Sequence, residues 1–174
     1  VIPHGAGEVT QILFDPEAGE TATLDLNGFN ETINGLTTQD SGASVIDNTG
    51  ATDSTLTFGA ADSAVTFGTT DTTITDSGTG TLSIQKTGTA AVTIGTGVNL
   101  TYEGSTGVDG GGSLTIEADL ASTNGLSVTG GSSLLDINGA ISAPSGITTV
   151  TVDSGGTLDL VNAAGDKLDS VTSL

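Results

Sequence analysis

The chain has 174 residues, of which 27 are glycine, four are phenylalanine and one is tyrosine, and it contains no tryptophan. Its core must therefore be thin and built from Val, Ile and Leu, because large aromatic rings are almost missing. The formal net charge of −19, with two lysines and no arginine, repels phosphate and argues against nucleic acids and anionic membranes as partners. A high-salt habitat fits the same charge.

The absence of cysteine excludes disulfides, thiolate catalysis and cysteine-based zinc sites. No run of about 18 apolar residues occurs, so we expect no helix that spans a membrane. The chain begins at Val1 without a methionine or a signal-like segment. We therefore expect residues 1–174 to form one domain that is a fragment or a processed piece of a larger extracellular protein.

Short pairs of apolar residues, separated by one small or polar residue, recur along the whole chain. This period of two is typical of a strand with one buried face. In chain order the pairs are Ile12/Phe14, Leu24/Leu26, Leu56/Phe58, Val65/Phe67, Leu82/Ile84, Val92/Ile94, Leu100/Tyr102, Leu114/Ile116, Leu126/Val128, Leu135/Ile137, Val150/Val152 and Leu158/Leu160. The predicted structural core consists of the pairs from Leu24/Leu26 onward, except Leu100/Tyr102, together with Ile33 and Leu36.

A strand with two buried residues cannot offset the entropy of ordering about nine residues, at about 1 to 2 kcal/mol each. The strands must therefore stack on one another. From Leu56 to Leu100 an apolar strand position recurs every eight to ten residues, which suits three strands per turn. We predict an all-β parallel β-helix (β-solenoid) with about 25 to 30 residues per coil and about six or seven coils, in a rod about 30 Å long.

An antiparallel sandwich is the alternative architecture. The pairs Asn27-Gly28 and Asn34-Gly35 fit two-residue hairpin loops, but a sandwich predicts strands of about five to eight residues and aromatic packing in the core. The short, similar strands favour the β-helix, in which both Asn-Gly pairs turn corners of a coil. Residues 161–171 come nearest to a helical pattern, and Gly165 within them favours a turn.

The stretch TLDLNGFNETINGL, residues 23–36, resembles the autotransporter-associated β-strand repeat, also called the passenger-associated transport repeat. The family's Ile-Pro-x-Gly segment corresponds to residues 2–5, its Leu-Thr-Val-Gly unit to residues 56–59, and its Lys-Thr-Gly segment with the following strand to residues 82–95. The family's Asn-Thr-Tyr-x-Gly-Gly-Thr-Thr segment has no clear copy. The resemblance implies a right-handed β-helix exported to the bacterial surface, commonly within a larger protein, and it implies no activity.

Four aspartates are the candidates for an enzymatic site. β-Helical enzymes that cleave pectin gather carboxylates around a basic residue. Asp25, Asp136, Asp153 and Asp159 fit one outer face, but no arginine accompanies them. Solvated turn acids are the simpler interpretation, and we expect no catalytic residue.

The Gly-rich stretch 107–116 resembles one nonapeptide of a calcium-binding roll, with Asp109 before the glycines. Calcium takes six to eight oxygen ligands, and true rolls repeat the unit in tandem. A single partial copy makes Asp109 a weak Ca²⁺ candidate, and we expect no cofactor.

The imidazole and the two ammonium groups indicate no site. His4 is the only histidine, and we interpret it as an exposed loop residue. We interpret Lys86 and Lys167 as ion-pair partners of acids such as Asp169.

Two functions of different classes fit these observations. The first is a structural or interaction module of an extracellular bacterial surface protein: an adhesin passenger, a stalk or a filament subunit. Because a stack leaves unpaired backbone groups at both ends, we expect residues 1–2 and 171–174 to contact copies of the chain or adjoining coils. The second is a polysaccharide-binding or polysaccharide-cleaving β-helix. Exposed aromatic residues for stacking on a sugar are the feature that this sequence lacks, because Tyr102 is the only tyrosine and the phenylalanines mostly occupy inward pair positions.

Overall fold

The computed structural model describes residues 11–39, 41–59, 65–68, 71–121, 123–141, 147–153 and 155–160, with the backbone alone for residues 65 and 67. Within these residues the fold is all-β and contains no helix that could cross a membrane. The predictions for His4, Lys167, residues 1–2 and residues 161–174 lie outside the described residues.

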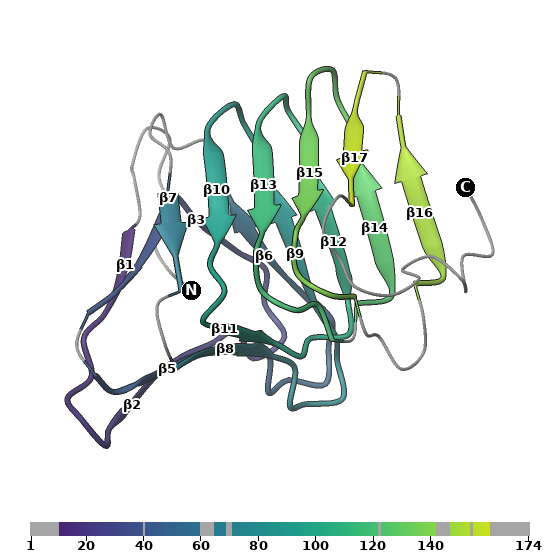
Figure 1. Ribbon diagram of the computed structural model, residues 1–174. Coiled ribbons are helices and arrows are strands. Elements are labelled where there is room, and N and C mark those ends of the chain that lie inside the picture. Colours follow the sequence, from purple (N-terminus) through teal and green to yellow (C-terminus); the bar gives the residue numbers. More distant parts are fainter. Residues whose placement is uncertain are drawn as a thin grey trace.

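The strands form the three faces of a solenoid (Figure 1). Face 1 contains β1 (Gln11–Phe14), β4 (Gly35–Thr38), β7 (Val65–Phe67), β10 (Ala91–Ile94), β13 (Ser113–Ile116), β15 (Leu134–Ile137) and β17 (Thr157–Asp159). Face 2 contains β2 (Thr21–Asp25), β5 (Ala43–Asp47), β8 (Thr72–Thr75) and β11 (Val98–Leu100). Face 3 contains β3 (Glu31–Ile33), β6 (Ser54–Phe58), β9 (Leu82–Lys86), β12 (Ser105–Val108), β14 (Gly125–Val128) and β16 (Thr149–Val152).

The chain runs through the faces in the order 1, 2, 3 and then repeats. In Figure 1 it descends along face 1 in front, crosses face 2 below and rises along face 3 behind, while it advances from the N-terminal end at the left to the right. The solenoid is therefore right-handed. We number the coils along the chain: coil 1 is β1–β3, coil 2 is β4–β6, coil 3 is β7–β9 and coil 4 is β10–β12.

Coils 5 and 6 replace the strand of face 2 by single bridging residues, Leu120 and Ile141, and β17 begins coil 7. Every strand pair among the described residues is parallel, which confirms the parallel β-helix and excludes the antiparallel sandwich. Ile46 and its partner in the next coil, Ile74, are 28 positions apart in the sequence. Leu100 and its partner Leu120 are only 20 positions apart. The predicted coil length of about 25 to 30 residues is thus too long for the C-terminal half, where Val92 and its partner Leu114 are 22 positions apart even though coil 4 keeps β11 on face 2.

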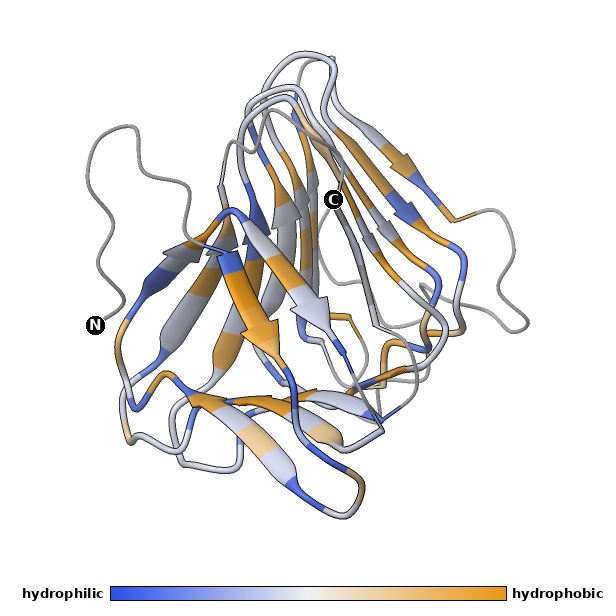
Figure 2. Ribbon diagram, turned by 90° about the vertical axis from the view of Figure 1, so that its left-hand side faces the viewer, coloured by the Kyte–Doolittle hydropathy of each residue, from blue (hydrophilic) through white to orange (hydrophobic). Residues whose placement is uncertain are grey.

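The interior is filled by the alternate residues of each strand, stacked like upon like. Leu56 pairs with Ile84, and Ile94 pairs with Ile116. Figure 2, which views the stack from its N-terminal end, shows the three faces around this interior. The predicted core residues that lie buried are Leu26, Ile33, Leu36, Leu56, Phe58, Leu82, Ile84, Val92, Ile94, Leu114, Ile116, Leu126, Val128, Leu135, Ile137 and Val150.

The predicted core residues at the two ends of the stack are less covered. Leu24 in coil 1 and Leu158 and Leu160 near β17 are only partly buried. The prediction is wrong for Val152, which is 48% exposed, because no described strand continues face 3 beyond β16. The side chains of Val65 and Phe67 are not described.

The first Asn-Gly pair turns a corner of the solenoid and does not close a hairpin. Asn27 and Gly28 both have positive φ, 47° and 83°, and they join β2 to β3 in two different faces. At the second pair the prediction holds for Asn34 alone, which forms the bend between β3 and β4. Gly35 is no turn residue, because it pairs with Gln11 as the first residue of β4.

Candidate functional site

Asp25, one of the four predicted catalytic candidates, binds the backbone of the next coil. It ends β2, where its Oδ1 accepts hydrogen bonds from the backbone N–H of Thr49 (3.2 Å) and of Asn27 (2.9 Å). Its Oδ2 accepts a bond of 2.7 Å from the Thr49 hydroxyl. The hydroxyl bond, assisted by the two backbone bonds, holds the pKa of Asp25 below its ordinary value. The carboxylate therefore joins coil 1 to coil 2.

Asp47 repeats this arrangement one coil further. Asp25 and Asp47 are in register on β2 and β5. Asp47 Oδ1 accepts from the backbone N–H of Ser77 (2.9 Å) and its Oδ2 accepts from the Ser77 hydroxyl (2.6 Å). Strands pair by backbone bonds along the faces, but the corners between faces leave N–H groups without a strand partner. The two aspartates satisfy such groups.

Three further aspartates accept backbone N–H bonds across a coil boundary. Asp53 accepts from Thr81 (2.9 Å) and Asp119 accepts from Ala140 (2.9 Å). Asp76 Oδ2 accepts both from Leu82 in its own coil and from Glu103 in the next coil, at 2.8 Å each. We call Asp25, Asp47, Asp53, Asp76 and Asp119 the carboxylate clasps. In each clasp the carboxylate lies in one coil and the N–H lies in the coil that follows along the chain.

A buried amide, Asn48, connects three successive coils at the corner between faces 2 and 3. It is fully buried. Its Oδ1 accepts from the backbone N–H groups of Gly28 (2.8 Å) and Gly50 (3.3 Å). Its Nδ2 donates to the carbonyls of Thr52, Gly80 and Thr81 at 3.0 to 3.1 Å. All the hydrogen-bonding capacity of Asn48 is used within the fold.

Lys86 lies in the interior, and none of the described acidic residues forms the ion pair that we predicted for it. Its side chain is fully buried at the end of β9, and its ammonium donates to the carbonyls of Thr87 and Gly88. No acidic partner occurs among its bonds to the part of the chain that the structure describes. Burial lowers the pKa of Lys86, because the low-dielectric interior disfavours the charged form.

A hydroxyl network fills the interior where coil 4 meets coil 5. The Tyr102 hydroxyl lies 2.7 Å from the Thr106 hydroxyl, which lies 3.3 Å from that of Thr123. Thr123 donates to the Gly104 carbonyl at 2.7 Å. Burial raises the pKa of Tyr102, and the nearby charge of Asp76 adds to that shift, so the phenol stays neutral. This boundary is held by neutral groups.

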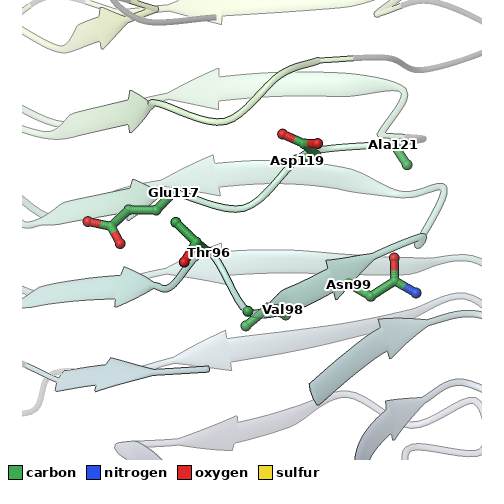
Figure 3. A pocket seen from close by; sticks show the side chains of 7 residues that line it. Thr96, Val98, Asn99, Glu117, Asp119 and Ala121 are labelled. Atoms are coloured by element: carbon green, nitrogen blue, oxygen red, sulfur yellow. The ribbon is translucent and has the colours of Figure 1, made fainter. Parts of the chain in front are cut away.

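The structure has an open groove, with a cavity volume of about 560 Å³, between coils 4 and 5 where face 1 meets face 2. It forms beside Leu120, the single residue that replaces a strand there. Its lining residues are Thr96, Gly97, Val98, Asn99, Glu117, Asp119 and Ala121. Figure 3 shows the carboxylates of Glu117 and Asp119 on one coil and Thr96 and Asn99 on the neighbouring coil.

The groove contains hydrogen-bonding groups but no aromatic side chain for stacking against a sugar. Glu117, Asp119 and Asn99 are exposed, and one oxygen of Asp119 already accepts from Ala140. None of these residues was among the predicted site residues, because each is an ordinary turn or edge residue in the sequence. The shortened face 2 of coil 5, which creates the groove, has no sequence signal of its own.

The four aspartates predicted for one outer face are not brought together. Asp136 and Asp159 are in register on face 1, in coils 6 and 7, and Asp136 accepts a bond from Asn138 (3.2 Å). Asp25 lies on face 2 in coil 1, and Asp153 follows β16 on face 3 in coil 6. The prediction that these aspartates share one outer face is therefore wrong.

Asp109, the weak calcium candidate, lies exposed after β12. Gly110 and Gly111, which follow it, both have positive φ, so the turn is tight. In the described ranges no three or more acidic or histidine side chains converge in a way that could hold a metal ion.

Comparisons with models of protein families, with curated proteins and with solved structures found no match for this chain.

Proposed function

We propose that this chain is a structural or interaction module of an extracellular bacterial surface protein of the autotransporter-repeat type, serving as a β-helical passenger, a stalk or a filament subunit. One observation carries the proposal: among the described residues, the polar side chains of the clasps and of Asn48 bind the backbone of neighbouring coils and do not converge on a common point. Such an arrangement maintains the shape of a rod and assigns the chain no reaction. The resemblance of residues 23–36 to surface-exported repeats supports the location.

The two ends of the stack support association of copies head to tail. At the C-terminal end Val152 presents an inward position of face 3 to solvent, 48% exposed. At the N-terminal end β1, β2 and β3 have one edge without a described strand partner. If a second copy continued face 1, Ile12 and Phe14 would follow Leu158 and Leu160, apolar upon apolar, as within the stack.

Substitution Val152→Lys tests this association, because it places a charge at an inward position of face 3 that the second copy would cover. We expect sedimentation velocity of the original chain, at high protein concentration and in enough salt to screen its charge of −19, to show species larger than the monomer that the variant lacks. Leu13→Lys is the matched control, since Leu13 is also exposed (54%) but points outward from β1. A chain that stays monomeric under all these conditions would remove head-to-tail association from the proposal.

A polysaccharide-binding role is the second candidate, and the groove between coils 4 and 5 favours it. Carboxylate, amide and hydroxyl groups from two coils line this groove, and such groups bind the hydroxyls of a glycan. A glycan array tests the candidate. Binding that Asn99→Ala weakens would support it, provided that Asn124→Ala, an exposed asparagine outside the groove, leaves binding unchanged. An array without hits would eliminate it.

A further inference from the structure

The outer surface of face 3 carries no charge at its strand positions. Its six strands lie side by side in one layer (Figure 1). The charged residues within these strands, Glu31 and Lys86, are buried. The residues that point outward are Thr32, Thr55, Thr57, Ser83, Gln85, Ser105, Gly107, Gly125, Ser127, Thr149 and Thr151. Face 3 therefore presents an uncharged sheet on a chain whose net charge is −19.

The other two faces differ from face 3 in charge and in length. Face 1 has Asp136 and Asp159 in register at outward positions, and its outward Leu13 is 54% exposed. Face 2 has strands only in coils 1–4 and carries the exposed Asp25. Of the faces that the structure describes, face 3 alone is both uncharged and continuous from coil 1 to coil 6.

Hydroxyl groups form two rows along the outside of face 3. Thr32 and Thr57 are in register in one row, and Thr55 and Ser83 are in register in the other. Neighbouring positions of a row are about 4.8 Å apart, and the two rows are about 6.6 Å apart. These distances are set by the backbone ladders of the sheet. The hydroxyl groups therefore repeat regularly without depending on one another.

The rows are interrupted at two glycines, and the surface stays flat there. A Cβ added at Gly107 would overlap Gln85 Oε1, so the long side chain of Gln85 lies along the sheet. Its amide can donate and accept hydrogen bonds, as a hydroxyl group can. Gly125 lies between Ser105 and Thr149 in the other row. No bulky group therefore rises from the centre of face 3.

A protein or a glycan is a poor partner for this surface. Protein interfaces have an apolar core, and none of the outward strand residues of face 3 is aliphatic or aromatic beyond a threonine methyl group. The six strands cover about 400 Å², whereas each partner in a stable protein complex contributes about 800 Å². A sugar ring would find no aromatic side chain on which to stack.

A lattice of water molecules fits the same surface. A Thr or Ser hydroxyl has a donor and two acceptor sites on a single oxygen, so it forms hydrogen bonds much as a water molecule does. Ice is an uncharged lattice of such groups, and repeats between its oxygen atoms are close to the two spacings of the rows. A charged side chain would hold nearby water in a different arrangement.

We propose that face 3 is an ice-binding surface, whose rows of hydroxyl groups hold water molecules in positions of the ice lattice. Three features support this assignment together: the lack of charge, the lack of an apolar core and the regular repeat of hydroxyl groups over six coils. Because the sheet fixes the positions in advance, binding costs little ordering entropy. The assignment is independent of the structural role proposed above, since a rod can have this face whatever it supports.

Slow growth of ice from a solution of the chain tests the proposal. We expect the chain to enter the ice and to be recovered from the melted ice, whereas a globular protein without affinity for ice stays in the liquid. Thr57→Lys with Ser127→Lys places two charges on face 3, in coils 2 and 5, and this variant should lose its incorporation. Thr37→Lys with Thr115→Lys is the matched control, because it places two charges on face 1 in the same coils.

Exclusion of the unmodified chain from the ice, or equal incorporation of the two Lys variants, would overturn the proposal. A dimer or a glycan-array signal that only the face 3 variant loses, with the unmodified chain excluded from ice, would assign the face to a copy of the chain or to a glycan instead. Circular dichroism checks that each variant is folded. If the face 3 Lys variant is unfolded, Thr57→Val with Ser127→Ala removes the hydroxyl groups at little cost in volume, and the same loss is expected.

Discussion

At the scale of single residues, the polar groups of the interior and the corners hold the coils in place. Asn48 shows this most clearly, because its amide makes five hydrogen bonds to the backbone of three coils. A substitution that removed this amide would leave its backbone donors and acceptors unsatisfied, which costs about 1 to 3 kcal/mol per group. Asn48 is therefore a point at which a small change has a large effect.

We predict that Asn48→Ala lowers the free energy of unfolding by at least about 3 kcal/mol, because several backbone groups lose their partner at once. Asn99→Ala is the control. Asn99 is exposed in the groove, so its substitution should change the free energy of unfolding by less than about 0.5 kcal/mol. Urea unfolding followed by circular dichroism measures both variants. Equal effects of the two substitutions would show that Asn48 is not the connector that the geometry describes.

At the scale of the element, the corners of successive coils approach each other backbone to backbone. A Cβ added at Gly78 would overlap the carbonyl oxygen of Gly50 in the preceding coil. The Gly78 N–H donates to the Asn48 carbonyl at 3.0 Å, which fixes this close approach. Glycine at Gly78 is thus required by the spacing between coils.

The substitution Gly78→Ala should destabilise the fold by about 1 to 3 kcal/mol, the usual cost of forcing an additional methyl group into a filled space. Gly131→Ala is the comparison, because no atom lies within 4 Å of a Cβ added there. Thermal unfolding of the two variants side by side gives the measurement. A Gly78→Ala variant as stable as Gly131→Ala would mean that coils 2 and 3 do not approach so closely.

The alternation of the sequence predicted the strands because it records which side of each strand is buried. It predicted the inward positions of Leu82 and Ile84 directly. The same alternation, continued by two residues, reaches Lys86. Asn48 lies two residues after Ile46, a buried position that was itself not among the predicted pairs. Both were missed as inward residues because the search stopped at apolar pairs. A polar residue that continues the period of two is the signal by which they could have been found.

Long-range geometry could not be read from the sequence in the same way. The groove depends on coil 5 having only Leu120 in face 2, and the clasps depend on which coil lies above each aspartate. Asp25 and Thr49 are 24 positions apart in the chain, a distance that becomes meaningful only once the coil length is known. The exposure of Val152 likewise depends on where the strands of face 3 end.

At the scale of the whole molecule, the described residues form a right-handed rod of stacked coils. The boundaries between coils are crossed by carboxylates such as Asp47 and by neutral groups such as the Asn48 amide and the Thr123 hydroxyl. The negative charge of −19 therefore has a structural component, since five aspartates form clasps. It also opposes the approach of a second copy, which makes association dependent on salt.

The central claim is that carboxylates of one coil hold the next coil, and a double-mutant cycle between Asp47 and Ser77 tests it most directly. The original chain, Asp47→Ala, Ser77→Ala and the double variant are compared through the exchange-derived opening free energy of residues 71–86. We predict a coupling free energy of about 1 to 2 kcal/mol between the two side chains, because each single variant already abolishes their bond. Effects of the two substitutions that simply add would contradict the claim.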